Sequence, residues 1–157
     1  DIIHRRVEQM NAWGVRVRWS GRRPKLWKSV IDELEKAQER TKNNTTIDVV
    51  FCLNYGGRDE ILRAARAWGR DVLAGRQGVE DLTDEVFSRY LDSRAVPDPD
   101  LIIRPSGELR LSNFLPWQSA YAEFYFTDVL WPDFNRYTFL ECLLEYQGRN
   151  RRFGGVA

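Results

Sequence analysis

The sequence predicts an α/β fold with a central, largely parallel sheet flanked by helices. Two observations carry this prediction. Short apolar runs at residues 47–53 and 101–103 have the length and composition of buried strands. Amphipathic segments with helical spacing lie between and around them. Strands that alternate with helices are typical of parallel sheets, because a parallel neighbour needs a crossover connection.

The first half of the chain begins with helical spacing over residues 2–13, and Gly14 is a suitable stop for that helix. Residues 15–19 alternate between apolar and polar side chains, which predicts a strand. Residues 26–37 carry the apolar stripe of a second helix. Residues 47–53 are mostly apolar and predict a strand that is covered on both faces.

The second half continues the alternation of helices and strands, and no repeat or linker interrupts it. Its expected elements are a helix over 59–75 with Asp59 as N-cap, a shorter helix over 82–91, strands over 101–103 and 122–126, and a last helix opened by a capping box of Thr138 and Glu141.

The charge balance limits the classes of partner. The 157 residues include 24 basic and 23 acidic side chains, for a net charge of +1. Such a chain has no bulk field for nucleic acid, so no nucleic-acid partner is expected and anions must bind at local clusters. Cys52 and Cys142 have neither metal-ligand spacing nor a disulfide framework, which indicates a cytoplasmic location.

The densest polar cluster follows the predicted strand at 101–103. It contains Arg104, Gly107, Arg110 and Ser112. Guanidinium groups bind phosphate oxygens in bidentate fashion, hydroxyls add neutral donors, and a glycine lets the backbone approach a ligand. These residues indicate an anion site. An ordinary surface turn, with Ser112 as a helix N-cap, is the alternative.

Glu123 is an acidic residue within an aromatic segment, where an unpaired carboxylate is costly to bury. It therefore either forms an ion pair with an arginine or binds a hard cation such as Mg²⁺ that bridges to a diphosphate. Residues 54–58 are interpreted as a tight turn. His4 has no visible catalytic partner, and the basic residues of segment 22–28 are interpreted as a solvated face.

Taken together, these segments resemble the cis-prenyltransferase family, the group that contains undecaprenyl diphosphate synthase. The order and spacing match over roughly residues 47–155, and Pro105 and Leu109 are mild departures. The matching segments read Asn54-Tyr55-Gly56-Gly57-Arg58, Ile103-Arg104-Pro105-Ser106-Gly107-Glu108, Arg110-Leu111-Ser112-Asn113-Phe114, Tyr121-Ala122-Glu123-Phe124-Tyr125-Phe126-Thr127-Asp128-Val129-Leu130-Trp131-Pro132-Asp133-Phe134 and Arg151-Arg152-Phe153-Gly154-Gly155.

The resemblance implies an enzyme that condenses isopentenyl diphosphate with an allylic diphosphate, in a Mg²⁺-dependent reaction, to give a cis (Z) polyprenyl diphosphate. It implies that Arg104, Arg110, Leu111 and Ser112 bind the diphosphate of isopentenyl diphosphate. It further implies that Glu123 helps to bind Mg²⁺.

The implied partners are the two diphosphate substrates, a second copy of the chain in a homodimer, and a membrane surface reached through the lipid product. Arg152 and Gly154 would reach the active site of the partner subunit in trans. Residues 1–157 would form the carboxyl-terminal portion of a single cis-prenyltransferase domain.

One segment that is typical of this family, the Met-Asp-Gly-Asn-Gly-Arg-Trp block, is not in this sequence. That block supplies the essential aspartate, so we expect it upstream and expect these residues alone to be inactive. The alternative function is a non-catalytic partner subunit of a heteromeric cis-prenyltransferase. Such subunits tend to lose the residues retained here at 104, 110, 112 and 123. A phosphate-binding module for a nucleotide or RNA is a third, weaker hypothesis.

Overall fold

The computed structural model describes the backbone of residues 2–150 and the side chains of residues 6–150. The chain divides into two compact units, residues 1–96 and residues 97–157. Each unit contains one pair of parallel strands, so the predicted α/β class and the parallel strand direction are confirmed. Across residues 2–150, no helix has the length and apolar character needed to cross a bilayer.

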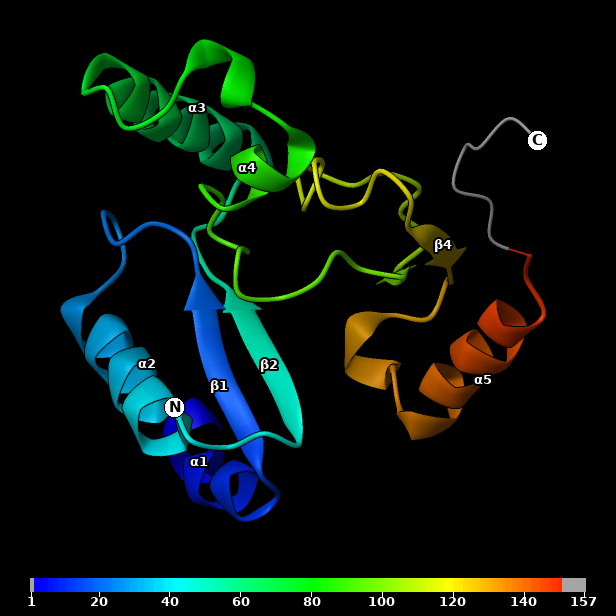
Figure 1. Ribbon diagram of the computed structural model, residues 1–157. Helices are drawn as coiled ribbons and strands as arrows, with labels where there is room; N and C mark the ends of the chain where they lie inside the picture. Colours follow the sequence, from blue (N-terminus) through cyan, green and yellow to red (C-terminus); the bar gives the residue numbers. More distant parts are fainter. Residues whose placement is uncertain (1, 151–157) are drawn as a thin grey trace. The chain divides into compact units, whose positions relative to one another are not determined.

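The first unit is built around the pair β1–β2, with α1 and α2 packed against β1 (Figure 1). Its elements are α1 (Ile2–Ala12), β1 (Val15–Ser20), α2 (Lys28–Thr41), β2 (Ile47–Cys52), α3 (Gly57–Leu73), the 3-10 turn η1 (Val79–Asp81) and α4 (Asp84–Ser88).

The outer edge of β1 is closed by side chains of α2. The Val17 N–H donates to Thr41 Oγ1 at 2.9 Å, and the Trp19 N–H donates to Gln38 Oε1 at 2.8 Å. Thr41 is fully buried and also donates to the Ala37 carbonyl. A helix that covers a sheet and also satisfies the outward backbone donors of its edge strand leaves that edge unable to pair further. Helix α2 therefore terminates the sheet on this side.

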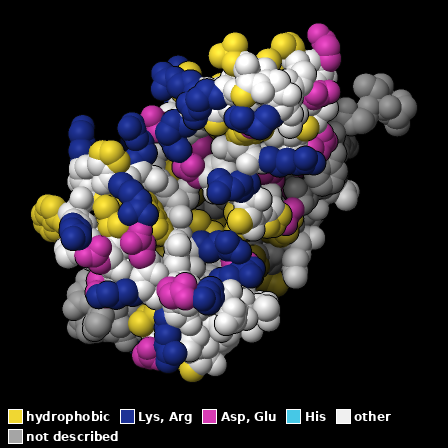
Figure 2. All heavy atoms as spheres, turned by 60° about the vertical axis from the view of Figure 1, so that its left-hand side comes forward, with side chains coloured by type: hydrophobic (Ala, Val, Ile, Leu, Met, Phe, Trp, Pro, Cys, Tyr) yellow, Lys and Arg dark blue, Asp and Glu magenta, His cyan; other side chains and the backbone are white. Residues whose placement is uncertain are grey.

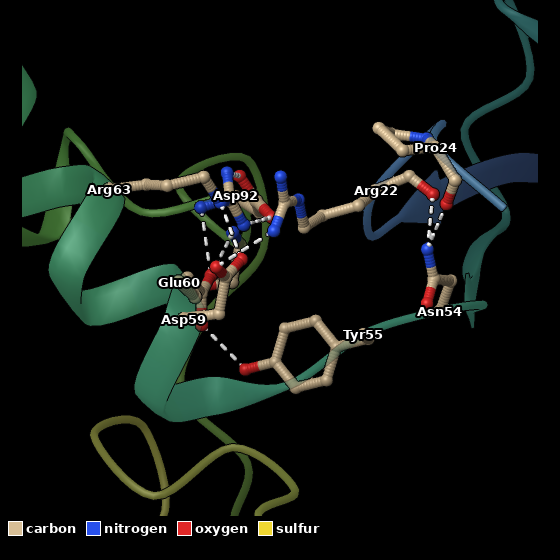
Figure 3. Close-up of polar contacts among 9 residues, drawn as sticks. Arg22, Pro24, Asn54, Tyr55, Asp59, Glu60, Arg63 and Asp92 are labelled. Carbon is tan, nitrogen blue, oxygen red and sulfur yellow. Dashed lines mark hydrogen bonds and ion pairs between the residues drawn. The ribbon is translucent and has the colours of Figure 1, made fainter.

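The loop that follows β1 is tied to the end of β2. Gly21 has φ +135, and a Cβ at this position would lie 1.9 Å from the Leu53 carbonyl oxygen, so only glycine fits. The Arg22 N–H donates to the Asn54 carbonyl at 3.2 Å. Asn54 Nδ2 in turn donates to the carbonyls of Arg22 and Pro24, at 2.9 and 2.7 Å (Figure 3). These bonds fix the base of the loop.

A buried carboxylate organises the start of α3. Glu60 is 1% exposed and accepts hydrogen bonds from the backbone N–H groups of Asp92 and Ser93, at 2.8 and 3.3 Å. Its other oxygen accepts from the Tyr55 hydroxyl at 2.5 Å (Figure 3). Burial and this bond raise the pKa of the Tyr55 phenol well above its usual range. Glu60 thus joins the β2–α3 turn to the segment after α4.

A partly buried ion-pair network continues from the same turn. Arg63 donates to both carboxylate oxygens of Asp92, at 2.8 and 2.6 Å, and to Asp59 at 2.9 Å. Arg22 reaches Asp59 from the loop after β1, at 3.2 Å (Figure 3). The Arg63 guanidinium holds the pKa of the Asp59 carboxyl below its usual value. Three chain segments therefore meet at one cluster of charges.

The second unit is smaller and contains β3 (Leu101–Arg104), β4 (Glu123–Phe126), the 3-10 turn η2 (Trp131–Asp133) and α5 (Arg136–Gln147). Strands β3 and β4 are parallel, with Leu101 opposite Glu123 and Arg104 opposite Phe126. Helix α5 contacts β4, and its Cys142 is fully buried.

The sequence placed the helices and strands correctly but misassigned several helix ends. Helix α3 has Gly56 as N-cap, while Asp59 lies within the first turn. Helix α5 is capped by Asn135, whose Oδ1 accepts from the N–H groups of Tyr137 and Thr138, so the capping box predicted at Thr138 was wrong. Helix α2 begins at Lys28, two residues later than its apolar stripe suggested.

Replacing Glu60 with Ala should destabilise the first unit, because it removes the acceptor for two backbone donors and the Tyr55 hydroxyl. We expect a loss of about 3 kcal/mol in the free energy of unfolding, measured by urea denaturation of the complete protein. Glu80→Ala is the matched control, because Glu80 is exposed and its removal should change stability by less than about 0.5 kcal/mol. Equal effects of the two substitutions would contradict a structural role for Glu60.

Candidate functional site

The polar turn predicted to bind an anion begins where β3 ends, at Arg104. Its backbone is unusual, because five residues between 106 and 115 have left-handed φ values and only one of them is glycine. Left-handed non-glycine residues cost of order 1 kcal/mol each and cluster at ligand-binding sites. The residues are Ser106, Gly107, Ser112, Asn113 and Leu115.

Backbone hydrogen bonds to the segment after β4 hold this turn in place. The Ser106 N–H donates to the Val129 carbonyl and the Gly107 N–H to the Thr127 carbonyl, both at 2.9 Å. The Thr127 N–H returns a bond to the Arg104 carbonyl at 3.1 Å. The turn is therefore anchored to β4 and its continuation, which compensates for its strained backbone.

The predicted phosphate ligands converge in part. Arg104 Nη2 donates to Ser112 Oγ at 3.3 Å, and Arg104 and Arg110 line one cavity of about 240 Å³. The Nε of Arg104 is buried and has no hydrogen-bond partner among residues 2–150. Arg110 is largely exposed and pairs with Glu108. A buried guanidinium nitrogen without an acceptor indicates that an anion completes its bonding.

The rest of the cavity wall is apolar. Leu111 lines it beside the arginines, and the other wall residues are Ile102, Ile103, Pro105, Phe114, Phe124 and Phe126. A cavity with two cationic side chains in an otherwise aliphatic and aromatic wall suits a small ligand with a charged head and a hydrocarbon part. The arginines and Leu111 were predicted from the sequence, whereas the phenylalanines could be recognised there only as apolar residues.

Glu123 lies apart from this cavity. It begins β4, opposite Leu101, whereas Arg104 ends β3. The two positions are three residues apart along parallel strands, or about 10 Å. Glu123 Oε2 accepts a hydrogen bond from Arg149 Nη1 at 3.0 Å, and the same nitrogen donates to the Phe124 carbonyl at 2.8 Å. The structure thus shows the ion pair that the sequence analysis considered.

A Mg²⁺ site is not formed by the described residues alone. Among residues 6–150, whose side chains the structure describes, no three His, Cys, Asp or Glu side chains come together as a metal-binding group. Glu123 supplies one carboxylate, and its partner is the Arg149 cation. Mg²⁺ is held through one or two carboxylates together with water and substrate phosphates, so Glu123 would be one ligand among several.

The remaining predicted ligands, Arg152 and Gly154, lie outside the described residues. Arg149 is a site residue that sequence reasoning missed. The only signal for it was its spacing of four residues from Glu145, which also accepts a hydrogen bond from it. This spacing reveals an ion pair within the helix end but gives no information on the contact with β4.

Arg149→Gln should loosen the attachment of the chain after α5 to β4, because it removes the charge-assisted bonds to Glu123 and Phe124. We expect a loss of about 1–2 kcal/mol in unfolding free energy by urea denaturation of the complete protein. Arg136→Gln is the control, because that exposed arginine makes its hydrogen bond and its cation–π contact with its sequence neighbour Tyr137. A smaller effect at position 149 than at 136 would argue against this attachment.

Comparison with known proteins gives consistent matches along the chain. Residues 1–154 match the family described as "Putative undecaprenyl diphosphate synthase". An isoprenyl transferase of Bifidobacterium longum is 59% identical, over 99% of this chain and 59% of its own length. A trans,polycis-polyprenyl diphosphate synthase of Thermobifida fusca, specific for (2Z,6E)-farnesyl diphosphate, is 56% identical, over 99% of this chain and 55% of its own length.

The fold matches solved structures as well. Lavandulyl diphosphate synthase from Lavandula x intermedia, in complex with dimethylallyl diphosphate, superimposes with a TM-score of 0.92 at 31% identity, covering 98% of this chain and 69% of its own. The chain spans little more than half the length of the curated relatives it matches. Sequence and fold agree: the chain belongs to the undecaprenyl diphosphate synthase family of prenyltransferases.

Proposed function

We propose that the protein to which this chain belongs is a cis-prenyltransferase, which condenses isopentenyl diphosphate with an allylic diphosphate to give a Z-polyprenyl diphosphate. The observation that carries the proposal is the cavity after β3, which Arg104 and Arg110 line together with a largely apolar wall, and the buried Nε of Arg104, which has no hydrogen-bond partner among the described residues. Isopentenyl diphosphate has the matching chemistry, with a dianionic to trianionic head and a five-carbon alkene.

In this function, Arg104, Arg110 and Ser112 bind the diphosphate of isopentenyl diphosphate. Arg110 would exchange its exposed pairing with Glu108 for the ligand, and Ser112 Oγ would add a neutral donor beside Arg104. Leu111 and the phenylalanine wall would hold the alkene. The chain positions this substrate so that its double bond attacks the allylic carbon, from which pyrophosphate departs. A proton is then lost to form the new double bond.

The division of the site explains why this chain would act only together with further residues. The cavity after β3 would hold one diphosphate, whereas the condensation needs two diphosphates side by side. We propose that a segment upstream of residue 1 binds the allylic diphosphate and supplies the essential aspartate. This is in keeping with the greater length of the relatives. The chain by itself would then be inactive.

Magnesium is proposed as the cofactor, with Glu123 as one ligand. When bound, Mg²⁺ would stabilise negative charge on the departing pyrophosphate. Glu123 would have to release Arg149, with which it is paired in this structure. The location is proposed to be cytoplasmic, in keeping with the free thiols of Cys52 and Cys142.

A homodimer is proposed for the assembled enzyme, with Arg152 and Gly154 acting in the active site of the partner subunit. Exposed apolar side chains of the second unit support an interface there, because obligate interfaces are rich in aromatic residues. They include Tyr121, Leu130, Trp131, Tyr137, Leu140 and Leu144. A non-catalytic subunit is the alternative function, and the paired state of Glu123 is the one observation that favours it.

Arg104→Ala in the complete protein tests the function. The substitution removes one charged contact to the diphosphate and should raise KM for isopentenyl diphosphate and lower kcat/KM by about tenfold to a hundredfold. The assay follows incorporation of isopentenyl diphosphate into Z-polyprenyl products, with farnesyl diphosphate as primer. Arg136→Ala, which removes an exposed arginine from the same unit, is expected to leave the kinetics unchanged. An absence of prenyl products from the complete wild-type protein would refute the catalytic function.

Glu123→Gln separates the metal role of this carboxylate from its structural one. The amide keeps the size of the side chain but removes the charge that a hard cation needs. If Glu123 is a metal ligand, the Glu123→Gln variant should need a higher Mg²⁺ concentration for half-maximal activity. The same reading predicts no such rise in Arg149→Gln, which frees the carboxylate. If both variants keep the wild-type Mg²⁺ dependence, Glu123 serves only as the ion-pair partner of Arg149.

A further inference from the structure

The loop between β1 and α2 combines a rigid base with an exposed tip. Its base is fixed by Gly21 and by the bonds that join Arg22 and Pro24 to Asn54. Its far end is fixed as well, because the Trp27 carbonyl accepts the first N–H groups of α2, from Val30 and Ile31. The backbone of the tip is therefore held in one conformation between two anchored ends.

The tip presents a large indole to solvent. Trp27 is 80% exposed, although it stands at the beginning of a helix in which the apolar Val30 and Ile31 are half-buried and Leu34 and Ala37 are buried. Neighbouring Lys25 has φ +71, a left-handed conformation that turns the chain sharply just before the indole. Exposing an indole on a fixed backbone forgoes the burial that usually accommodates this side chain. The exposed indole on a fixed backbone therefore favours contact with the surface of another molecule or assembly.

The charged residues next to the indole in the sequence are all cations. Residues 21–28 include four cations and no acid. Arg22 and Arg23 are paired with Asp59 and Glu35, whereas Lys25 and Lys28 form no ion pair with any residue in the described range 6–150. In Figure 2, where the left-hand side of Figure 1 comes forward, Lys and Arg side chains are frequent, Asp and Glu side chains lie among them, and hydrophobic side chains protrude between them.

We propose that the tip formed by residues 25–28 is a contact site for an anionic phospholipid surface. Trp27 would insert at the headgroup level, where the amphipathic indole is favoured, and Lys25 and Lys28 would pair with lipid phosphates. A protein partner would be expected to offer the exposed indole a pocket and the cations fixed acids. The tip instead has one flat aromatic group flanked by two unpaired, flexible lysines, which matches a fluid anionic surface. The proposal concerns a surface distinct from the β3 cavity, and its test requires no enzymatic activity.

The test is co-sedimentation of the purified complete protein with vesicles of phosphatidylcholine alone or with 30% phosphatidylglycerol. The protein should partition onto the anionic vesicles and remain in solution with the neutral ones. A Lys25→Gln, Lys28→Gln double variant should lower the partition coefficient about 30-fold, since each cation near the surface contributes about a factor of five. Trp27→Ala should lower it about tenfold.

Matched control variants remove the same number of lysines, or one indole, at positions outside residues 25–28. Lys36→Gln with Lys42→Gln removes two lysines of α2 that are paired with Glu33 and Glu39. Trp13→Ala removes an indole that is 62% exposed before β1. Both controls should bind the vesicles nearly as the wild type does. The proposal is overturned if the wild type shows no preference for anionic vesicles, or if either control weakens binding as much as its counterpart in the tip.

Discussion

The parallel pairing of β3 with β4 is the constraint on which the candidate site depends. Its register sets Arg104 and Phe126 at one end of the pair and Leu101 and Glu123 at the other. The cavity can form only where the strands end and the chain is free to turn, so the cationic and aromatic groups gather there. The same register carries Glu123 away from the cavity and into reach of Arg149.

Local pattern was sufficient to predict much of this arrangement. Apolar runs and helical spacing identified the strands and helices, and the rule that ligands bind beyond strand ends directed attention to residues 104–112. The helix ends were less predictable, since several polar residues competed to cap the same turn. Asn135 caps α5 because its side chain reaches two backbone donors, and nothing in the sequence ranks it above Thr138.

Long-range polar contacts could not have been predicted. In the sequence, Glu60 looks like an ordinary acidic residue in the first turn of an amphipathic helix. In the structure it is buried and accepts hydrogen bonds from the N–H groups of Asp92 and Ser93, which lie 32 and 33 positions further along the chain. Likewise, the pairing of Arg149 with the first residue of β4 depends on how α5 packs against that strand. Such contacts follow from tertiary packing, and a single sequence carries no periodic signal for them.

Because Thr41 and Gln38 close the outer edge of β1, the first sheet can be extended at one edge only. With the outward donors of one border already occupied by a helix, any additional strand must join at β2. A sheet with one admissible border cannot propagate through stacked copies in the way that an open two-stranded ribbon can. The side chains of α2 therefore act as a terminator as well as a covering layer, limiting self-association while keeping the β2 border available for extension.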